Sequence, residues 1–212
     1  MSEVTDRRAR KRLETRRNIS YAATGLFAEK GFDNVTIDEI ASAADVGRMT
    51  VFNHFPRKED MFFDRDDEIR QTVTDALRQR HDAESPIESL RLLAHRLIAE
   101  DRPFLQFSDA SQEFIAIVNG SETLKARARA IRDEVANGVA AELAHCAGRE
   151  DVDADAQLAA ALQLACWSTA LISAHEEFAQ SLDATRAAAT FLKLVDKGAA
   201  GLNAALAGTP YV

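Results

Sequence analysis

Residues 36–55 of the chain read TIDEIASAADVGRMTVFNHF, and their spacing is the most informative feature of the sequence. Thr36, followed three residues later by Glu39, has the pattern of a capping box at the start of a helix over residues 37–44. A three-residue turn and a second short helix, over residues 48–54, follow. Two short helices joined in this way predict a helix-turn-helix, in which the second helix enters the major groove of DNA.

The side chains of this stretch divide into an inner and an outer set. Ala41 is small enough to lie where the two helices cross. The apolar residues that we expect to form the small core, against Leu26 and Phe27, are Ile37, Ile40, Val46, Val51 and Phe55. The outer face of the second helix then carries Arg48, Met49, Thr50, Asn53 and His54. These include donors suited to phosphates and base edges, and Arg48 lies at the N-terminal end that enters the groove first.

Helical spacing continues on both sides of this motif. Upstream, one helix with its apolar residues at i, i+3, i+4 and i+7 is expected to end at Gly31. Downstream, further helices are predicted over residues 57–78, 87–100, 103–118, 121–146, 154–179 and 184–206. The sequence therefore predicts an all-α protein with two parts, a helix-turn-helix domain over residues 1–63 and a larger helical body over residues 64–212.

Charge is divided unevenly along the chain, with the change of sign at the end of the helix-turn-helix. The 212 residues have a formal net charge of −8, which by itself argues against a nucleic-acid partner. Residues 1–58, however, hold 11 Lys and Arg against 8 Asp and Glu, a net charge of +3, and the rest of the chain has a net charge of −11. A basic N-terminal part on an acidic body indicates an anionic partner for the first part.

The same region resembles the DNA-binding domain of the TetR family of transcriptional regulators. The resemblance covers residues 16–63 and is carried by LFAEKGF at 26–32, by T-x-x-x-I-A-x-x-A from Thr36 and by V-x-x-x-T-V-F-x-H-F from Val46. A closing K-E-D begins at Lys58. The body carries no motif of the family, but its length and helical character are consistent with the family's ligand-binding and dimerisation domain.

The resemblance implies roles for individual residues. Thr36, His54 and Lys58 would contact phosphates, and Thr50 would contact the backbone or a base. Phe52 stands where the family usually has a tyrosine, so apolar contact replaces a hydroxyl bond to phosphate. Asp45 stands where a turn glycine is common, and Asp tolerates a left-handed conformation better than most residues.

The first residues of the chain are strongly basic. Arg7 to Arg12 contains five Lys and Arg residues and lies before the predicted first helix. It is interpreted either as an arm that tracks phosphates or the minor groove, or as a solvated terminus.

Motifs of catalysis and metal binding are missing from the sequence. There is no G-x-S-x-G, Gly-rich phosphate loop, H-E-x-x-H or C-x-x-C, and no two of the five histidines have i, i+4 spacing. We therefore expect no enzyme activity, catalytic residue, metal or cofactor. The two cysteines, Cys146 and Cys166, form no disulfide framework and are interpreted as small buried residues.

Aromatic residues of the body are candidates for an apolar effector pocket. Phe104, Phe107 and Phe114 have spacings that would place them on one face of the helix predicted over 103–118, with Trp167 opposite. His95 is a candidate polar contact to the same ligand. The alternative for each aromatic residue is plain core packing.

The uncharged stretch Ala156–Ala174 is 19 residues long and reaches the length of a membrane span. Its seven alanines and its polar interruptions favour a buried helix of a soluble protein, and with no secretory signal at the start we expect a cytoplasmic location without membrane contact.

In TetR-like proteins the last two long helices form a four-helix dimer interface, a position that residues 156–174 and 187–206 occupy here. The alternative is that both lie within the core of one subunit.

These observations predict a homodimeric TetR-like regulator, a repressor that leaves a pseudo-palindromic operator when a small molecule binds its body. The predicted helix over 57–78 would couple the two events. One alternative is a DNA-binding dimer without an effector. The other is a helical enzyme with a chance helix-turn-helix pattern.

Overall fold

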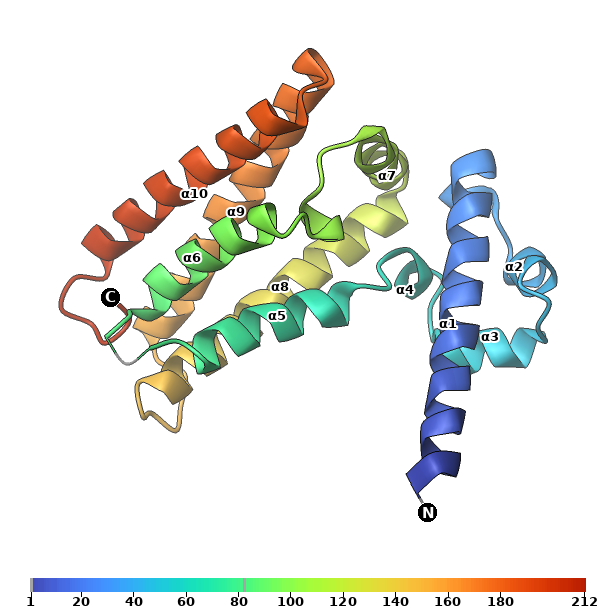
Figure 1. Cartoon of the computed structure of the whole chain (residues 1–212), viewed down its shortest axis with the longest axis horizontal. Helices are drawn as coiled ribbons and strands as arrows, with labels where there is room; N and C mark the ends of the chain where they lie inside the picture. Colours follow the sequence, from blue (N-terminus) through green and yellow to red (C-terminus); the bar gives the residue numbers. More distant parts are fainter. Residues whose placement is uncertain (1, 82) are drawn as a thin grey trace. The chain divides into compact units, whose positions relative to one another are not determined.

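The computed structural model describes residues 2–81 and 83–212, and no strand occurs in these residues (Figure 1). The helices are α1 (Ser2–Lys30), η1 (Phe32–Asn34), α2 (Ile37–Ala43), α3 (Arg48–His54), α4 (Glu59–Phe62), α5 (Asp66–Arg78), α6 (Pro86–Ala99), η2 (Pro103–Leu105), α7 (Asp109–Gly120), α8 (Glu122–Cys146), α9 (Ala154–Ser181) and α10 (Ala184–Ala205). The all-α prediction is confirmed. The chain forms two compact units: an N-terminal unit of Met1–Asp66 with Glu113–Ala128, and a C-terminal unit of Asp67–Gln112 with Arg129–Val212.

The N-terminal unit packs α2, α3 and α4 around the second half of α1 (Figure 1). Its fully buried side chains include Ile40, Val51 and Phe55 of the helix-turn-helix and Phe27 of α1, while Ala41 at the crossing is 5% exposed. Ile37, Val46 and Leu26 pack against this core as half-buried residues. The core predicted from the spacing of residues 36–55 is therefore confirmed.

The end of α7 and the start of α8 complete this unit, which the sequence did not predict. Phe114 stacks on Phe62 with ring centroids 4.4 Å apart, and Leu124 is fully buried in the same core. Arg127 forms ion pairs with Asp60 at 3.2 Å and Asp66 at 3.4 Å, all three side chains being mostly buried. The N-terminal unit thus includes residues far beyond position 63.

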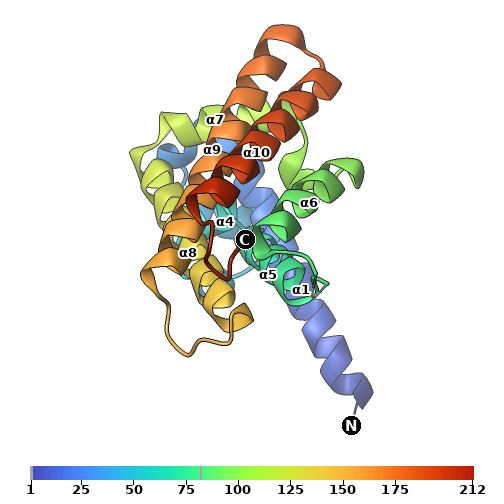
Figure 2. The ribbon, with the colours of Figure 1, turned by 90° about the vertical axis from the view of Figure 1, so that its left-hand side faces the viewer.

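In the C-terminal unit, α9 and α10 lie side by side as an antiparallel pair, and α6 packs on α10 (Figures 1 and 2). Asp153 caps α9 and Asp183 caps α10 through side-chain oxygens that accept backbone N–H bonds. The two helices approach closely at Gly198, where an added Cβ would lie 2.8 Å from both Cβ and Sγ of Cys166. The absence of a side chain at Gly198 therefore permits the close contact of α9 with α10.

The single helix predicted over 57–78 is wrong. The structure has two helices there, α4 and α5, separated by a turn over residues 63–65. Ser20 of α1 donates a hydrogen bond to the Asp64 carboxylate at 2.6 Å, and Phe63 packs edge-on against Phe114. These tertiary contacts hold the turn out of the helical conformation.

The helix predicted over 103–118 is likewise interrupted. The 3-10 helix η2 occupies 103–105, and α7 begins only at Asp109. Ser108 and Ser111 form a reciprocal cap, in which the Ser108 N–H donates to Ser111 Oγ at 2.9 Å and the Ser111 N–H donates to Ser108 Oγ at 3.3 Å. A serine three residues before another was the local signal for this helix start.

Two further expectations are modified. The basic stretch from Arg7 to Arg12 lies inside α1 rather than before it, and its side chains are exposed. In the described residues α9 alone is long and apolar enough to cross a membrane by length and composition. One face of α9, including Ala159, Ala170 and Ala174, is buried against its own unit.

Candidate nucleic-acid interface

Local hydrogen bonds set the geometry of the helix-turn-helix. The Thr36 hydroxyl accepts from the Glu39 N–H at 3.2 Å, and the Glu39 carboxylate accepts from the Thr36 N–H at 2.9 Å, so the predicted capping box is present. The hydrogen bond from Lys30 is the main cause that lowers the pKa of Glu39 to about 2, and hydrogen bonds from Thr36 lower it further. Asp45 has φ 51°, the left-handed conformation expected where a turn glycine is common. Asp45 therefore adopts the left-handed conformation of this turn position without a glycine.

The outer face of α3 is available to a partner. The Met49 side chain is 69% exposed, Phe52 is 37% exposed, and Asn53 is exposed beside them. Thr50 and His54 are half-buried at the edge of this face. These residues with Arg48, which we call the recognition face, form the surface that the sequence predicted for DNA contact.

Arg48 already has a partner in this structure. The guanidinium Nη1 of Arg48 lies 3.0 Å from Oδ2 of Asp38, which is in the first turn of α2. The Cζ atom of Arg48 also lies 5.7 Å from the centroid of the Phe52 ring. Both charged side chains are well exposed, at 59% and 69%. An exposed ion pair is weak, so it holds the Arg48 side chain only loosely. Nothing in the ten-residue separation of the two indicated this pair.

The C-terminal end of α3 is tied to α1 by Arg16. Its Nη1 donates to the His54 carbonyl, and its Cζ lies 4.0 Å above the Phe55 ring centroid. Burial lowers the pKa of His54, and the charges of Arg12 and Arg16 lower it further. The neutral form of His54 is therefore favoured in this structure. These contacts also place two basic residues of α1 beside the end of the recognition face.

Lys58 is held inside the N-terminal unit. Its Nζ donates to the carbonyls of Phe32 at 2.7 Å and Val35 at 2.9 Å, and it lies 4.2 Å from the Phe32 ring centroid. Burial is the main cause that lowers the pKa of Lys58. Lys58 thus stabilises the connection between α1 and α2. Its contact with a phosphate stays a prediction.

The candidate ligand residues of the body fall into three places. Phe107 is buried and Phe104 and Trp167 are half-buried in the core of the C-terminal unit. Phe114 does not join them, because α7 begins after Phe107 and Phe114 packs in the N-terminal unit. The common helix face that the sequence predicted for these rings is therefore wrong.

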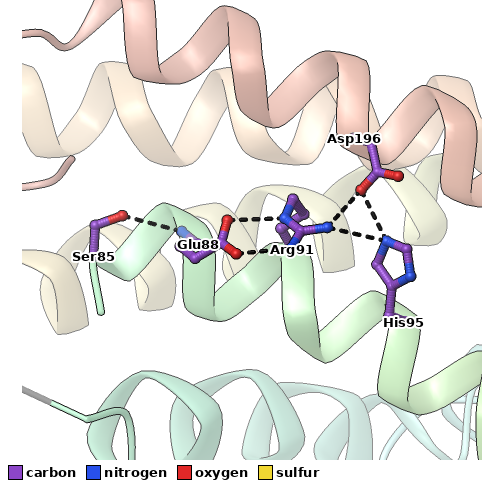
Figure 3. Close-up of polar contacts among 5 residues, drawn as sticks. All are labelled: Ser85, Glu88, Arg91, His95 and Asp196. Carbon is purple, nitrogen blue, oxygen red and sulfur yellow. Dashed lines mark hydrogen bonds and ion pairs between the residues drawn. The ribbon is translucent and has the colours of Figure 1, made fainter. Parts of the chain in front are cut away.

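His95 belongs to a polar cluster between α6 and α10 (Figure 3). Its Nε2 is 2.8 Å from Asp196 Oδ1, and Arg91 Nη1 donates to the same oxygen at 2.9 Å. Arg91 also donates two hydrogen bonds to the Glu88 carboxylate. These bonds are the main cause that lowers the pKa of Glu88. His95 therefore joins two helices of the unit. Its predicted ligand contact stays a prediction.

A groove of about 340 Å³ lies between α5 and α6 and is lined largely by polar side chains. They include Asp75, Arg80, Glu84, Arg96 and Arg102. Among the described residues that line it, none was predicted as a ligand contact. The described residues also contain no group of three or more His, Cys, Asp or Glu placed to hold a metal ion.

An all-helical chain with a helix-turn-helix and an exposed recognition face defines a DNA-binding protein of the helix-turn-helix class. Residues 19–64 match the family model described as bacterial regulatory proteins, tetR family. The match covers the helix-turn-helix region alone, and there the chain is similar to the DNA-binding domain of this family of regulators.

Individual relatives are distant. The HTH-type transcriptional regulator TcmR of Streptomyces glaucescens is 31% identical over 83 residues, and the chain spans 37% of the length of that protein and 39% of its own. A putative TetR-family regulator of Mesorhizobium loti superposes with a TM-score of 0.55 at 21% identity, covering 92% of this chain and 97% of the other. SmeT in complex with triclosan gives 0.57 at 18% identity, covering 89% and 91%. At such identities the likeness shows the fold.

Proposed function

We propose that this protein is a homodimeric transcriptional repressor of the cytoplasm whose N-terminal units bind a pseudo-palindromic operator. A small-molecule effector bound by the C-terminal unit releases the DNA. The observation that carries the proposal is the recognition face of α3, where Arg48, Met49, Phe52 and Asn53 project outward while Val51 and Phe55 anchor the helix in the core. A helix held in this way can enter a major groove without changing its conformation and can contact the base edges there.

The basic residues of α1 support the same assignment. Arg12 and Arg16 lie close enough to His54 to lower its pKa, so the basic stretch from Arg7 to Arg17 leads to the end of the recognition face. Phosphates flanking the groove would be neutralised by these side chains, and binding would weaken steeply with salt. In this proposal the basic stretch acts as part of α1, in place of either an arm or a solvated terminus before the first helix.

The repressor and effector parts of the proposal draw on two relatives. SmeT and NalD are described as repressors of multidrug efflux pumps, and SmeT has been solved with triclosan. For an effector to act on this chain, it must bind the DNA-incompetent arrangement more tightly than the DNA-competent one. The segments most suited to transmit such a change are the end of α7 and the start of α8, which pack on α4 within the N-terminal unit.

A footprint on the DNA flanking its own gene tests this function. We expect protection of two half-sites whose centres lie about one helical turn, or a multiple of it, apart. The Arg48→Ala, Thr50→Ala double variant should abolish protection, and Arg132→Ala, which removes an exposed arginine of α8, should retain it. Protection that survives the double variant would show that α3 is not the reader. The absence of any protected sequence would refute the repressor assignment.

A further inference from the structure

The groove between α5 and α6 contains two arginines that each have a buried N–H group without an acceptor. These groups are Nε of Arg80 and Nε of Arg102, and neither has a partner among the residues that the structure describes. A buried donor left unpaired costs stability, and the cost is larger when its group is charged. Because a guanidinium has donors only, the groove lacks hydrogen-bond acceptors. A ligand that brings acceptors would remove this cost.

The two arginines lie at opposite ends of the groove. Arg80 follows α5, and its Nη1 donates to the Leu77 carbonyl at 3.0 Å. Arg102 follows α6, which runs in the opposite direction (Figure 1), and its Nη2 donates to Glu68 near the start of α5 at 3.1 Å. Leu77 comes nine residues after Glu68 on α5, so the two guanidinium groups are about 14 Å apart along this helix. A single ligand that meets both must be elongated.

The acidic residues that line the groove do not neutralise its arginines. These acidic residues are Asp75, Glu84 and Glu100. In the described part of the chain, none of them forms an ion pair with Arg80, Arg96 or Arg102, the three arginines of the groove. Arg102 pairs instead with Glu68, and both side chains are well exposed, at 36% and 43%. An exposed pair is weak, so each end of the groove keeps an arginine that can bind an anion.

The floor between the two ends is apolar. Ala76, Leu93 and Leu97 line it and are almost entirely buried. Ser89 also lines the groove, but its hydroxyl donates to the Ala76 carbonyl at 2.9 Å. Methylene groups can cover such a floor favourably. A negative charge in the middle of a ligand would instead face Asp75, which lies between the two ends on α5.

We propose that this groove binds an elongated dicarboxylate, with one carboxylate at Arg80, the other at Arg102 and an aliphatic chain between them. Each carboxylate accepts from Nε–H and from a neighbouring Nη–H, the two-bond geometry in which a guanidinium matches a carboxylate. A small rotation of either long side chain presents its Nε–H to the groove. As an effector site, the groove rests on the proposed function, because only release of the operator would make the dicarboxylate an effector.

Three probes are titrated into the full-length protein at pH 7 by isothermal titration calorimetry. Suberate has two carboxylates joined by an eight-carbon chain, octanoate has the same chain with one carboxylate, and succinate is too short to reach both arginines. We expect saturable binding of one suberate per chain. Octanoate and succinate can each meet only one arginine, so each should bind at least about tenfold more weakly, the value of one hydrogen bond to a charged group.

Arg80→Gln and Arg102→Gln should each remove the preference for suberate over octanoate. Glu68→Gln is the matched control for the second variant, because it breaks the same ion pair but keeps the arginine, and it should retain the preference. Arg132→Gln, at an exposed arginine of α8, controls for the loss of one positive charge and should also retain it. Far-UV circular dichroism reports whether each variant folds, and lysine, which lacks the two-bond geometry, replaces glutamine where it does not.

Equal affinity for suberate and octanoate in the unchanged protein would overturn the proposal, as would a preference that survives in either arginine variant. Tighter binding of octanoate would also overturn it and would point to an apolar site in the core. Loss of the preference in Glu68→Gln or Arg132→Gln would trace it to the ion pair or to net charge rather than to the groove, and would refute the site.

Operator release is measured separately, by gel shift with and without suberate. Suberate binding without release upholds the site and refutes its role as the effector site. Operator binding without any suberate binding refutes the site and leaves the DNA-binding function standing. Suberate binding by a protein that binds no operator upholds the groove and refutes the proposed function.

Discussion

Arg48 lies at the N-terminal end of the recognition face, and in the absence of DNA its guanidinium pairs with Asp38. Both side chains are exposed, so water screens the pair and it contributes little to stability. In the proposed complex with DNA, Asp38 places a negative charge beside the surface that faces the phosphates. The Asp38 carboxylate would therefore compete with DNA for the Arg48 side chain.

Asp38→Asn should tighten operator binding, because it frees Arg48 and removes a repulsive charge. An exposed pair is worth up to about 1 kcal/mol, so we expect about a fivefold lower Kd with an unchanged melting temperature. Fluorescence anisotropy with labelled operator DNA measures this. Asp133→Asn is the matched control, since Asp133 forms an equally exposed pair with Arg132 on α8. Weaker binding by Asp38→Asn would mean that the pair holds Arg48 in its reading position.

At the scale of single elements, local patterns predicted the helix-turn-helix well because its determinants are local. A capping box, a left-handed Asp45 and alternating buried residues all lie within residues 36–55. The break between α4 and α5 was missed because Asp64 is fixed by Ser20, 44 residues away in the sequence. Phe114 was misplaced for the same reason, since its partner Phe62 is distant in the chain. Long-range contacts of this kind leave no periodic signal.

The close approach of α9 and α10 at Gly198 leaves no room for a side chain. A Cβ at Gly198 would lie 2.8 Å from Cβ and Sγ of Cys166, closer than such atoms approach. An added Cβ at Gly198 would force the backbones of α9 and α10 apart. Gly198→Ala should therefore lower the free energy of unfolding by about 1–3 kcal/mol. Urea denaturation of the purified protein checks this value.

Gly201 provides the matched control within the same helix. It also lies in α10, but a Cβ added there would meet nothing within 4 Å. Alanine has the higher helix propensity, so Gly201→Ala should raise stability by up to about 1 kcal/mol. A stabilising effect at both positions would show that α9 and α10 separate easily. In the Gly198→Ala background, Cys166→Gly should recover part of the loss.

At the scale of the whole molecule, α9 has an apolar face that its own unit leaves uncovered. Leu158 is 46% exposed and Ile172 is 60% exposed on this helix, with Ala161, Ala165 and Thr169 exposed between them. Residues at this spacing lie along one side of a helix. Exposed apolar surface of this extent is typical of protein–protein interfaces, and it supports the proposal that a second copy of the chain covers it.

Replacing both large residues with charges tests this dimer. Leu158→Glu with Ile172→Glu would bury four carboxylates in a two-fold interface, so we expect a monomer by light scattering coupled to size-exclusion chromatography. A monomer has one reading helix, and loss of the linked second half-site should weaken operator binding by about 100-fold or more. Leu92→Glu, at a 39% exposed leucine of α6, is the control and should leave mass and affinity unchanged. A double variant that keeps the dimer mass would move the interface away from α9. A variant that is monomeric yet binds the operator at full affinity would show that each N-terminal unit reads DNA independently.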